Sequence, residues 1–177
     1  LVILEDYNKG LLTKNVIEKV IGICKKNNIL TAVDPKRKNF FEYKEVDIFK
    51  PNLHEIKEGL NILGEEISEK LLGEMHDLLT EKLQHKISFI TLSEKGVFYE
   101  SGTEKAIIPT HIRSIADVSG AGDTVIAIAS VVYAATKNVR LMADIANIAG
   151  GMVCEEVGTV AIDKNKLLEE CKNLLAK

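Results

Sequence analysis

The first half of the chain alternates short apolar runs with longer segments in which apolar residues recur at helical spacing. The short runs are rich in β-branched and aromatic residues and are bounded by polar turns. They predict buried strands, at residues 1–4, 30–33, 46–49 and 87–92. The longer segments predict helices, from the candidate N-cap Thr13 to about Asn27, over 53–60 and over 67–83. This alternation is typical of a parallel sheet covered by helices on both faces.

The second half of the chain follows a different pattern. Residues 96–100 and 105–109 indicate two short antiparallel strands joined by a Ser-Gly turn. Apolar periodicity then predicts three helices, over residues 121–136, 141–156 and 164–175. Gly150 and Gly151 weaken the middle helix, which indicates that another element packs closely there. The sequence therefore predicts a three-layer α/β/α protein with a mostly parallel sheet and a short antiparallel hairpin near 96–109.

Composition and charge are those of a soluble globular protein. A length of 177 residues suits one domain, 1–177, with a core of its own. Hydrophobic residues make up 46% and charged residues 28%, and no apolar run approaches the roughly 20 residues of a membrane helix. The net charge of −3 provides no electrostatic footprint for nucleic acid or an anionic membrane. We therefore expect no nucleic-acid partner and no membrane association.

The cysteines and histidines do not form a recognisable site. Cys24, Cys154 and Cys171 are far apart and odd in number, which fits neither a disulfide framework nor a zinc site. We expect them to be buried or half-buried free thiols in a reducing cytoplasm. The four histidines show no i, i+4 pairing for a metal and are interpreted as surface or packing residues.

The chain begins without an initiator methionine, a charged leader or a signal peptide, directly on the apolar run Leu1–Leu4. A natural domain seldom starts inside a core strand, because such a strand needs neighbours on both sides. We therefore expect the chain to be an excised or truncated piece of a longer protein.

The segment from Asp117 to Thr124, Asp-Val-Ser-Gly-Ala-Gly-Asp-Thr, is the strongest chemical signal in the chain. Two glycines flank an alanine just before an apolar helix, so backbone N–H groups are exposed at a helix N-terminus, which is a ready anion site. Asp123 lies in the first turn, where the helix dipole favours the ionised carboxylate by roughly 0.3–1 kcal/mol. A carboxylate beside an anion hole suits phosphoryl transfer, since it can accept a hydroxyl proton while the amides bind the transferring charge.

Two other interpretations of this segment stay open on spacing alone. Gly-x-Gly near a helix start also occurs in the dinucleotide-binding fingerprint, although Val125 stands at the third glycine position and the segment lies late in the chain. The segment can also be a plain glycine turn with Asp123 as an ordinary helix-start residue.

Together with other motifs, the segment resembles the C-terminal signature of the ribokinase (PfkB) family of carbohydrate kinases. Further marks of that family occur in order along the chain: Asp6-Tyr7-Asn8-Lys9-Gly10, Asp34-Pro35-Lys36, Pro51-Asn52-Leu53-His54-Glu55, Thr91-Leu92-Ser93-Glu94-Lys95-Gly96, and Ala146-Asn147-Ile148-Ala149 before Gly158-Thr159. Each falls where a ligand site is expected in a parallel sheet. The resemblance covers essentially the whole chain and implies a ribokinase-like fold of which this chain is the C-terminal, nucleotide-binding part.

Within the family, the motifs are most similar to those of D-glycero-β-D-manno-heptose-7-phosphate kinases. These enzymes pair Asp-Tyr-x-Lys-Gly with Asp-Pro-Lys and a downstream Phe and Tyr, here Phe40 or Phe41 and Tyr43. The resemblance implies ATP-dependent phosphorylation of the anomeric hydroxyl of heptose 7-phosphate, towards ADP-heptose for lipopolysaccharide. Two alternatives stay open: another sugar or nucleoside kinase of this fold, and a non-catalytic nucleotide or sugar sensor. A sensor is expected to have lost its base or anion hole, and both are intact here.

The resemblance also implies roles for individual residues. Asp123 would be the general base, and the amides of Gly120, Ala121 and Gly122 would form the anion hole for the transferred phosphoryl group. The residues expected around ATP are Thr91, Ser93 and Gly96 near the phosphates and ribose, Asn52 near the phosphates, and Asn147 and Gly158 near the adenine.

Asn52 and Glu55 match the family motif that positions Mg²⁺, directly or through water. A carboxylate with an amide partner fits a hard cation that keeps several waters. From the residues alone, the pair is also a helix-start Asn with an incidental Glu three positions on. Asp117 and Ser119 correspond to residues that help to bind a monovalent cation in some relatives.

Family members carry the sugar-binding residues and a small β-sheet lid, the usual dimer surface, in an N-terminal half. The full-length protein is therefore expected to be a homodimer, with the sugar phosphate and ATP as its small-molecule partners.

We predict that residues 1–177 alone have little or no kinase activity, because the half that binds the sugar is not part of this sequence. A coupled ADP-release assay with heptose 7-phosphate measures this activity. Robust turnover by these residues alone would refute the prediction.

Overall fold

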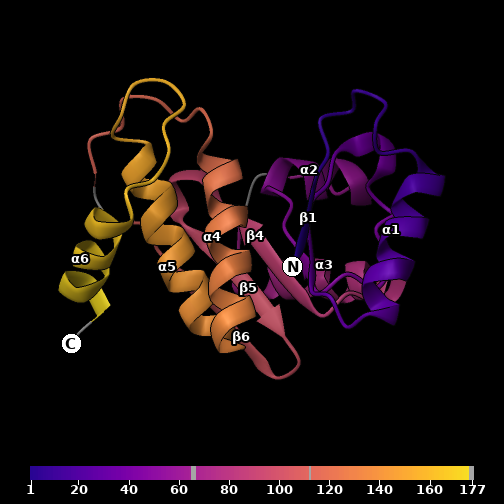
Figure 1. Cartoon of the computed structure of the whole chain (residues 1–177). Coiled ribbons are helices and arrows are strands. Elements are labelled where there is room, and N and C mark those ends of the chain that lie inside the picture. Colours follow the sequence, from indigo (N-terminus) through magenta and orange to yellow (C-terminus); the bar gives the residue numbers. More distant parts are fainter. Residues whose placement is uncertain (65–66, 112, 176–177) are drawn as a thin grey trace.

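The computed structural model describes residues 1–64, 67–111 and 113–175, and there it shows one six-stranded sheet between layers of helices (Figure 1). The strands, in spatial as well as chain order, are β1 (Val2–Glu5), β2 (Thr31–Asp34), β3 (Ile48–Phe49), β4 (Ile87–Thr91), β5 (Val97–Ser101) and β6 (Glu104–Ile108). Strands β1 to β4 are parallel, and β5 and β6 continue the sheet as an antiparallel hairpin. The predicted α/β fold with its mostly parallel sheet is confirmed.

The helices of the described residues also follow the predicted order. They are α1 (Lys14–Lys26), α2 (Leu53–Leu60), α3 (Glu69–Leu83), α4 (Ala121–Thr136), α5 (Val139–Val153) and α6 (Lys164–Leu175). The bounds of α2, α4 and α6 agree with the sequence, and Thr13 caps α1 as expected.

The bounds predicted for α5, 141–156, were wrong at both ends. The helix begins earlier because the Asn138 side chain accepts a hydrogen bond from the Leu141 amide at 2.8 Å and so caps it. It stops at Val153. The next carbonyl, that of Cys154, accepts the amides of Ala116 and Asp117 at 2.8 and 3.2 Å, so a distant segment meets the chain there.

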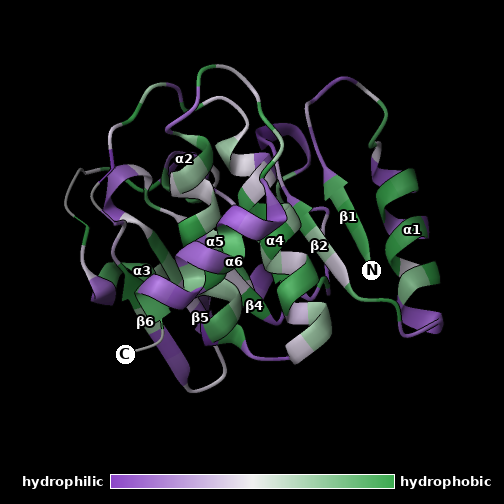
Figure 2. Ribbon diagram, turned by 60° about the vertical axis from the view of Figure 1, so that its left-hand side comes forward, coloured by the Kyte–Doolittle hydropathy of each residue, from purple (hydrophilic) through white to green (hydrophobic). Residues whose placement is uncertain are grey.

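The sheet separates two hydrophobic cores because successive strand residues point to opposite faces. On β2, Val33 belongs to the core under α1, α2 and α3, while its neighbour Ala32 belongs to the core under α4 and α5. Ile48 and Phe49 on β3 divide in the same way. In Figure 2 much of the inner ribbon has the hydrophobic colour, whereas helix α6, which lies outermost in Figure 1, carries much of the hydrophilic colour. The functional side chains are therefore placed by a rigid, doubly covered sheet.

The two glycines of α5 mark close approaches, as the sequence indicated. A Cβ on Gly150 would lie 2.6 Å from the Val125 side chain of α4, and one on Gly151 would lie 2.9 Å from Nε of Arg113. Such separations leave no room for a side chain, so α4 and Arg113 both lie directly against the backbone of α5.

Buried histidines form a polar cluster on the α3 side of the sheet. His76 Nδ1 and His85 Nε2 both hydrogen-bond Ser88 Oγ, at 2.8 and 2.6 Å. The two rings also meet edge to face, and His85 packs against Phe49. These two histidines are therefore packing residues. The three cysteines are free, with Cys24 buried and the others partly buried, as expected.

Across the described ranges, none of the helices combines the length and the apolar character that a membrane crossing requires.

Acid is expected to destabilise the fold through His85. Burial, with a smaller contribution from His76, lowers the pKa of His85 from 6.5 to about 4. Between these values the unfolded chain binds the additional proton, so stability falls as the pH falls. We expect this group alone to remove roughly 2 kcal/mol of unfolding free energy between about pH 7 and pH 4.5.

Urea denaturation at both pH values measures the effect. His85→Gln should lose less stability on acidification than the matched variant of the exposed His54, His54→Gln. An identical pH dependence in the two variants would contradict the prediction.

Candidate active site

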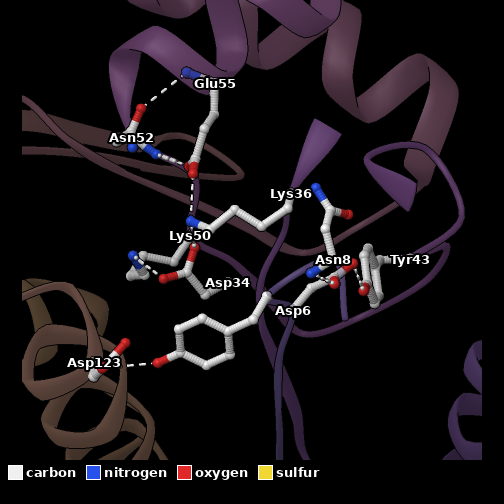
Figure 3. A network of polar contacts seen from close by, with 10 residues as sticks. Asp6, Asn8, Asp34, Lys36, Tyr43, Lys50, Asn52, Glu55 and Asp123 are labelled. Atoms are coloured by element: carbon white, nitrogen blue, oxygen red, sulfur yellow. Dashed lines mark hydrogen bonds and ion pairs between the residues drawn. The ribbon is translucent and has the colours of Figure 1, made fainter. Parts of the chain in front are cut away.

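Polar side chains from distant parts of the sequence converge where the parallel strands end, beside the N-terminus of α4 (Figure 3). Tyr7 follows β1, Asp34 ends β2 and Lys50 follows β3. Asp123 lies in the first turn of α4 and completes the group. The carboxyl ends of parallel strands meet at one edge of a sheet, which explains this convergence.

The turn that opens α4 requires glycine. Gly120, the N-cap, has a φ of 78°, and a Cβ at this position would lie 2.8 Å from the Thr159 side chain. The Gly120 carbonyl accepts the Thr124 amide at 3.0 Å, and the Ala121 amide donates to Val118 at 3.3 Å. Of the three amides expected in the anion hole, that of Ala121 therefore already has an acceptor. The Gly122 amide lies in the first turn of the helix, where no helical acceptor exists.

Asp123 already accepts a hydrogen bond from a hydroxyl group. The Tyr7 hydroxyl donates to its Oδ2 at 2.9 Å, although the two residues are 116 positions apart. This hydrogen bond, with a smaller contribution from burial, raises the pKa of Tyr7 to about 12. Tyr7 is 56% exposed, so an O–H group at this position is reached from the surface.

A buried ion pair lies beneath the α4 N-terminus. Lys50 is only 2% exposed, and its ammonium contacts Asp34 Oδ2 at 3.0 Å. A Cβ on Gly122 would lie 3.8 Å from both of these atoms, so the pair is in contact distance of the first turn of α4. The other oxygen of Asp34 contacts Lys36 at 3.4 Å, and Lys36 also pairs with Glu55. A row of alternating charges thus connects α2 to α4 (Figure 3).

Glu5, at the end of β1, adds a further carboxylate to this region. Its pKa is raised by burial and then by the charges of Asp123 and Asp34, while Lys50 opposes the effect. The cluster therefore carries several acidic groups around one buried ammonium.

A second buried network fixes the loop that carries Tyr7. Asp6 accepts hydrogen bonds from the Asn8 amide at 2.8 Å, from Asn39 Nδ2 at 2.9 Å and from the Tyr43 hydroxyl at 2.7 Å. Burial and the bond to Asp6 raise the pKa of Tyr43, which stays a neutral donor. The residue next to Asp6 in the chain is thereby held in place.

Asn52 and Glu55 form a reciprocal cap on α2. Asn52 Oδ1 accepts the Glu55 amide and Glu55 Oε2 accepts the Asn52 amide, each at 2.8 Å. The structure thus shows this pair as the cap at the start of a helix, which is one of the two interpretations of its sequence. The remaining oxygen of Glu55 faces the Lys36 ammonium.

The donor set around Lys36 suits a hard cation held partly through water. Asp34 and Glu55 present two carboxylates to one cationic group, and Mg²⁺ commonly uses one or two carboxylates together with water and phosphate oxygens. In the part of the chain that the structure describes, no three His, Cys, Asp or Glu side chains gather closely enough to hold a metal ion alone. A cation at these residues would take the place of the Lys36 ammonium and would draw its other ligands from phosphate and water.

The residues expected around ATP belong to separate local groups. Thr91 pairs with Asn52 as an isolated parallel bridge, since its amide donates to the Pro51 carbonyl at 3.2 Å. Ser93 begins a short turn, and Gly96 ends it with a φ of 97° at a place where a Cβ would lie 2.0 Å from the Ile108 carbonyl oxygen. Thr91 and Asn52 are thus brought together.

Asp117 lies elsewhere, on the segment before α4. Its Oδ1 accepts the Ser119 amide and hydroxyl at 2.9 and 2.8 Å, and its Oδ2 accepts the Gly158 amide at 3.1 Å. These bonds lower the pKa of Asp117. Asn147 is buried on α5 and donates to the Pro109 carbonyl at 2.9 Å. In the described residues, no hydrogen bond or ion pair joins Asp117 to Asn52 or Glu55.

Sequence reasoning missed Lys50, Glu5 and the contact made by Tyr7. Lys50 carried a usable signal, because a lysine directly after a buried strand stands at the ligand-binding edge of a parallel sheet. The Tyr7–Asp123 contact has no local signature.

Comparison with known proteins agrees with this fold. The model of the pfkB family carbohydrate kinases matches residues 7–166. The chain is 37% identical over 171 residues to the bifunctional protein HldE of Aliarcobacter butzleri and 36% identical over 170 residues to that of Sulfurimonas denitrificans. Each match covers 95% of this chain and 35% of the relative, so the chain spans about a third of these relatives.

Solved structures share the fold. Arabidopsis thaliana ribokinase, solved with ribose and ATP, superposes with a TM-score of 0.83 at 20% identity, covering 97% of this chain and 55% of the other. A mutant of phosphofructokinase-2 from Escherichia coli gives a TM-score of 0.83 at 13% identity, covering 99% of this chain and 56% of the other. The chain thus corresponds to slightly more than half of each structure.

We predict that Lys50→Met destabilises the protein by about 3 kcal/mol, because removing one partner of a buried pair leaves the other charge uncompensated. Lys36 still contacts Asp34, which places the cost at the lower end of the usual range. Urea denaturation measures the loss. Lys86→Met, which breaks the exposed pair of Lys86 with Asp47, is the matched control and should cost about 1 kcal/mol or less.

The double variant Asp34→Asn with Lys50→Met should recover part of the lost stability, since no buried charge is then left alone. A Lys50→Met variant as stable as the Lys86→Met control would show that the buried pair does not have this role.

Proposed function

Because this chain belongs to the pfkB family of carbohydrate kinases, we propose that it forms the ATP-binding and phosphoryl-transfer part of a sugar-phosphate kinase. Its acceptor in this proposal is D-glycero-β-D-manno-heptose 7-phosphate, and the product is the 1,7-bisphosphate used to make ADP-heptose for lipopolysaccharide. The proposal concerns the full-length protein, in which residues 1–177 would form the C-terminal, nucleotide-binding part of the kinase domain.

The observation that carries the proposal is the position of Asp123 in the first turn of α4, with a hydroxyl group 2.9 Å from Oδ2. In the proposed reaction a sugar hydroxyl takes the place of the Tyr7 hydroxyl. The sugar oxygen forms a bond to the γ-phosphorus of ATP while the bond from that phosphorus to the β,γ-bridging oxygen breaks. The hydroxyl proton passes to Asp123, and ADP leaves with the bridging oxygen.

Charge around the α4 N-terminus supports this chemistry. In the anion hole of Gly120, Ala121 and Gly122, the free amides would bind the transferring phosphoryl group. The ammonium of Lys50, which pairs with Asp34 and lies close to Gly122, adds positive potential from below. Because this cation is buried, water screens its effect on a bound phosphate less than it would at the surface.

Nucleotide and metal are assigned to the flanking residues. Thr91, Ser93 and Gly96 would border the phosphates and ribose, and Asn147 and Gly158 the adenine. Asn52 and Glu55 would hold Mg²⁺ through water, and the ion would neutralise charge on the phosphates when bound. Asp117 and Ser119 are proposed to help to bind a monovalent cation. Each of these assignments rests on the motif resemblance and on the position of the residue.

The choice of heptose 7-phosphate rests on motif similarity and on relatives that are named HldE. Ribokinase from Arabidopsis thaliana was solved with ribose and ATP, so the fold itself also serves other sugars. We further propose that the full-length enzyme is a cytoplasmic homodimer that acts on small molecules rather than on nucleic acid or at a membrane.

In the full-length protein, Asp123→Asn should lower kcat by roughly 10²–10⁴-fold, because the amide cannot accept the hydroxyl proton. ATP should still bind, since the amides of the helix start remain. Initial rates and calorimetric ATP binding measure the two effects. Asp144→Asn, which alters the carboxylate that pairs with Arg140 on α5, is the control and should leave both unchanged.

A panel of acceptors should give the highest kcat/KM for heptose 7-phosphate. A better acceptor would replace the assigned sugar and leave the kinase assignment intact. ATP binding without turnover of any acceptor would favour the sensor alternative instead, and an Asp123→Asn enzyme with normal kcat would exclude Asp123 as the base.

A further inference from the structure

Arg113 joins three segments of the chain and has only 11% of its side chain exposed. Its Nη1 donates to Glu155 just after α5 at 2.8 Å, and its Nη2 donates to Glu170 on α6 at 2.5 Å. The planar fork of a guanidinium places two such bonds in a fixed relative geometry. Arg113 therefore holds the segment before α4, the end of α5 and α6 together.

Gly151 makes the position of Arg113 possible. A Cβ at Gly151 would lie 2.9 Å from Arg113 Nε and 3.0 Å from its Cδ. Within the described ranges, that Nε is buried and has no hydrogen-bond partner. An unpaired buried N–H group is costly, so the side chain is held here by its other contacts. The double glycine of α5 thus provides the space in which the arginine lies.

After Arg113, the chain runs alongside the turn formed by residues 154–159 and then reaches the start of α4. The Cys154 carbonyl accepts the amides of Ala116 and Asp117, and Asp117 accepts the Gly158 amide at 3.1 Å. At the far end, Gly120 lies close to Thr159, because a Cβ on Gly120 would be 2.8 Å from the Thr159 methyl group. The segment and the turn are therefore joined at several points, with Arg113 at one end and the anion hole at the other.

We infer that Arg113 is a positioning residue for the nucleotide, which acts by fixing the turn 154–159 against the segment 113–120. This inference rests on the proposed function, in which Gly158 borders the adenine and Gly120 opens the anion hole. Asp123 is held separately, by α4 and the Tyr7 hydroxyl. The anion-hole turn is also fixed locally, because the Gly120 carbonyl accepts the Thr124 amide at 3.0 Å. The chemical step should therefore depend on Arg113 less than the nucleotide side of the site does. The nucleotide side of the site can therefore weaken while the base stays in place.

Arg113→Met in the full-length protein should raise the KM for ATP by roughly three- to thirty-fold, the range expected for one coupled residue. The kcat and the KM for the sugar acceptor should stay near the wild-type values. Arg113→Lys keeps the charge without the fork and should give an intermediate KM. Arg140→Met removes the more exposed ion pair of Arg140 with Asp144 on α5 and should leave the KM for ATP unchanged.

Gly151→Ala provides a second route that keeps the arginine. The added methyl group should displace Arg113 and raise the KM for ATP, but it should have little further effect in the Arg113→Met background. Such non-additivity is the signature of two residues that act through one contact.

Hydrogen exchange separates a failure of this inference from a failure of the proposed function. Amides of the turn 154–159 should exchange faster in Arg113→Met than in wild type or Arg140→Met. If the wild-type protein neither binds nor uses ATP, the proposed function fails, and unchanged exchange then overturns the positioning role as well. In an active enzyme, the role is overturned if Arg113→Met has the ATP KM of Arg140→Met, or if it lowers only kcat.

Discussion

The buried contact between Lys50 and Asp34 is the constraint on which the active-site region depends. It joins the end of β2 to the end of β3 and lies in contact distance of the first turn of α4. A buried ammonium beside the positive end of a helix is unfavourable unless negative charge is close to both. Asp34 supplies that charge from one side. On the proposed function, a phosphate bound at the helix start would supply it from the other.

Much of the fold could be predicted from the sequence because it depends on local periodicity. The bounds of α2, α4 and α6 follow from apolar spacing and turn residues alone. The end of α5 does not follow from local spacing. Just beyond this end, the Cys154 carbonyl accepts hydrogen bonds from the amides of Ala116 and Asp117, which are far away in the sequence. At this end of α5, prediction failed because a tertiary contact competes with helix propagation.

The candidate site was predictable to a similar degree and for the same reason. Motifs with a local signature, such as the glycines before Asp123 and the cap formed by Asn52 and Glu55, could be found from spacing. The contact of Tyr7 with Asp123 could not, because nothing near Tyr7 records which carboxylate it meets. Likewise, nothing in the sequence around Asn147 indicates that its side-chain amide donates a hydrogen bond to the Pro109 carbonyl.

The hydrogen bond from Tyr7 to Asp123 has a thermodynamic consequence for substrate recognition. An acceptor sugar that reaches Asp123 does not add a hydrogen bond to an empty carboxylate, because it replaces one O–H donor with another. Such an exchange contributes little net affinity. On the proposed function, the sugar is therefore bound by contacts away from the reacting hydroxyl. The interaction with Asp123 strengthens only as the proton begins to move, which favours a high rate over tight binding of the ground state.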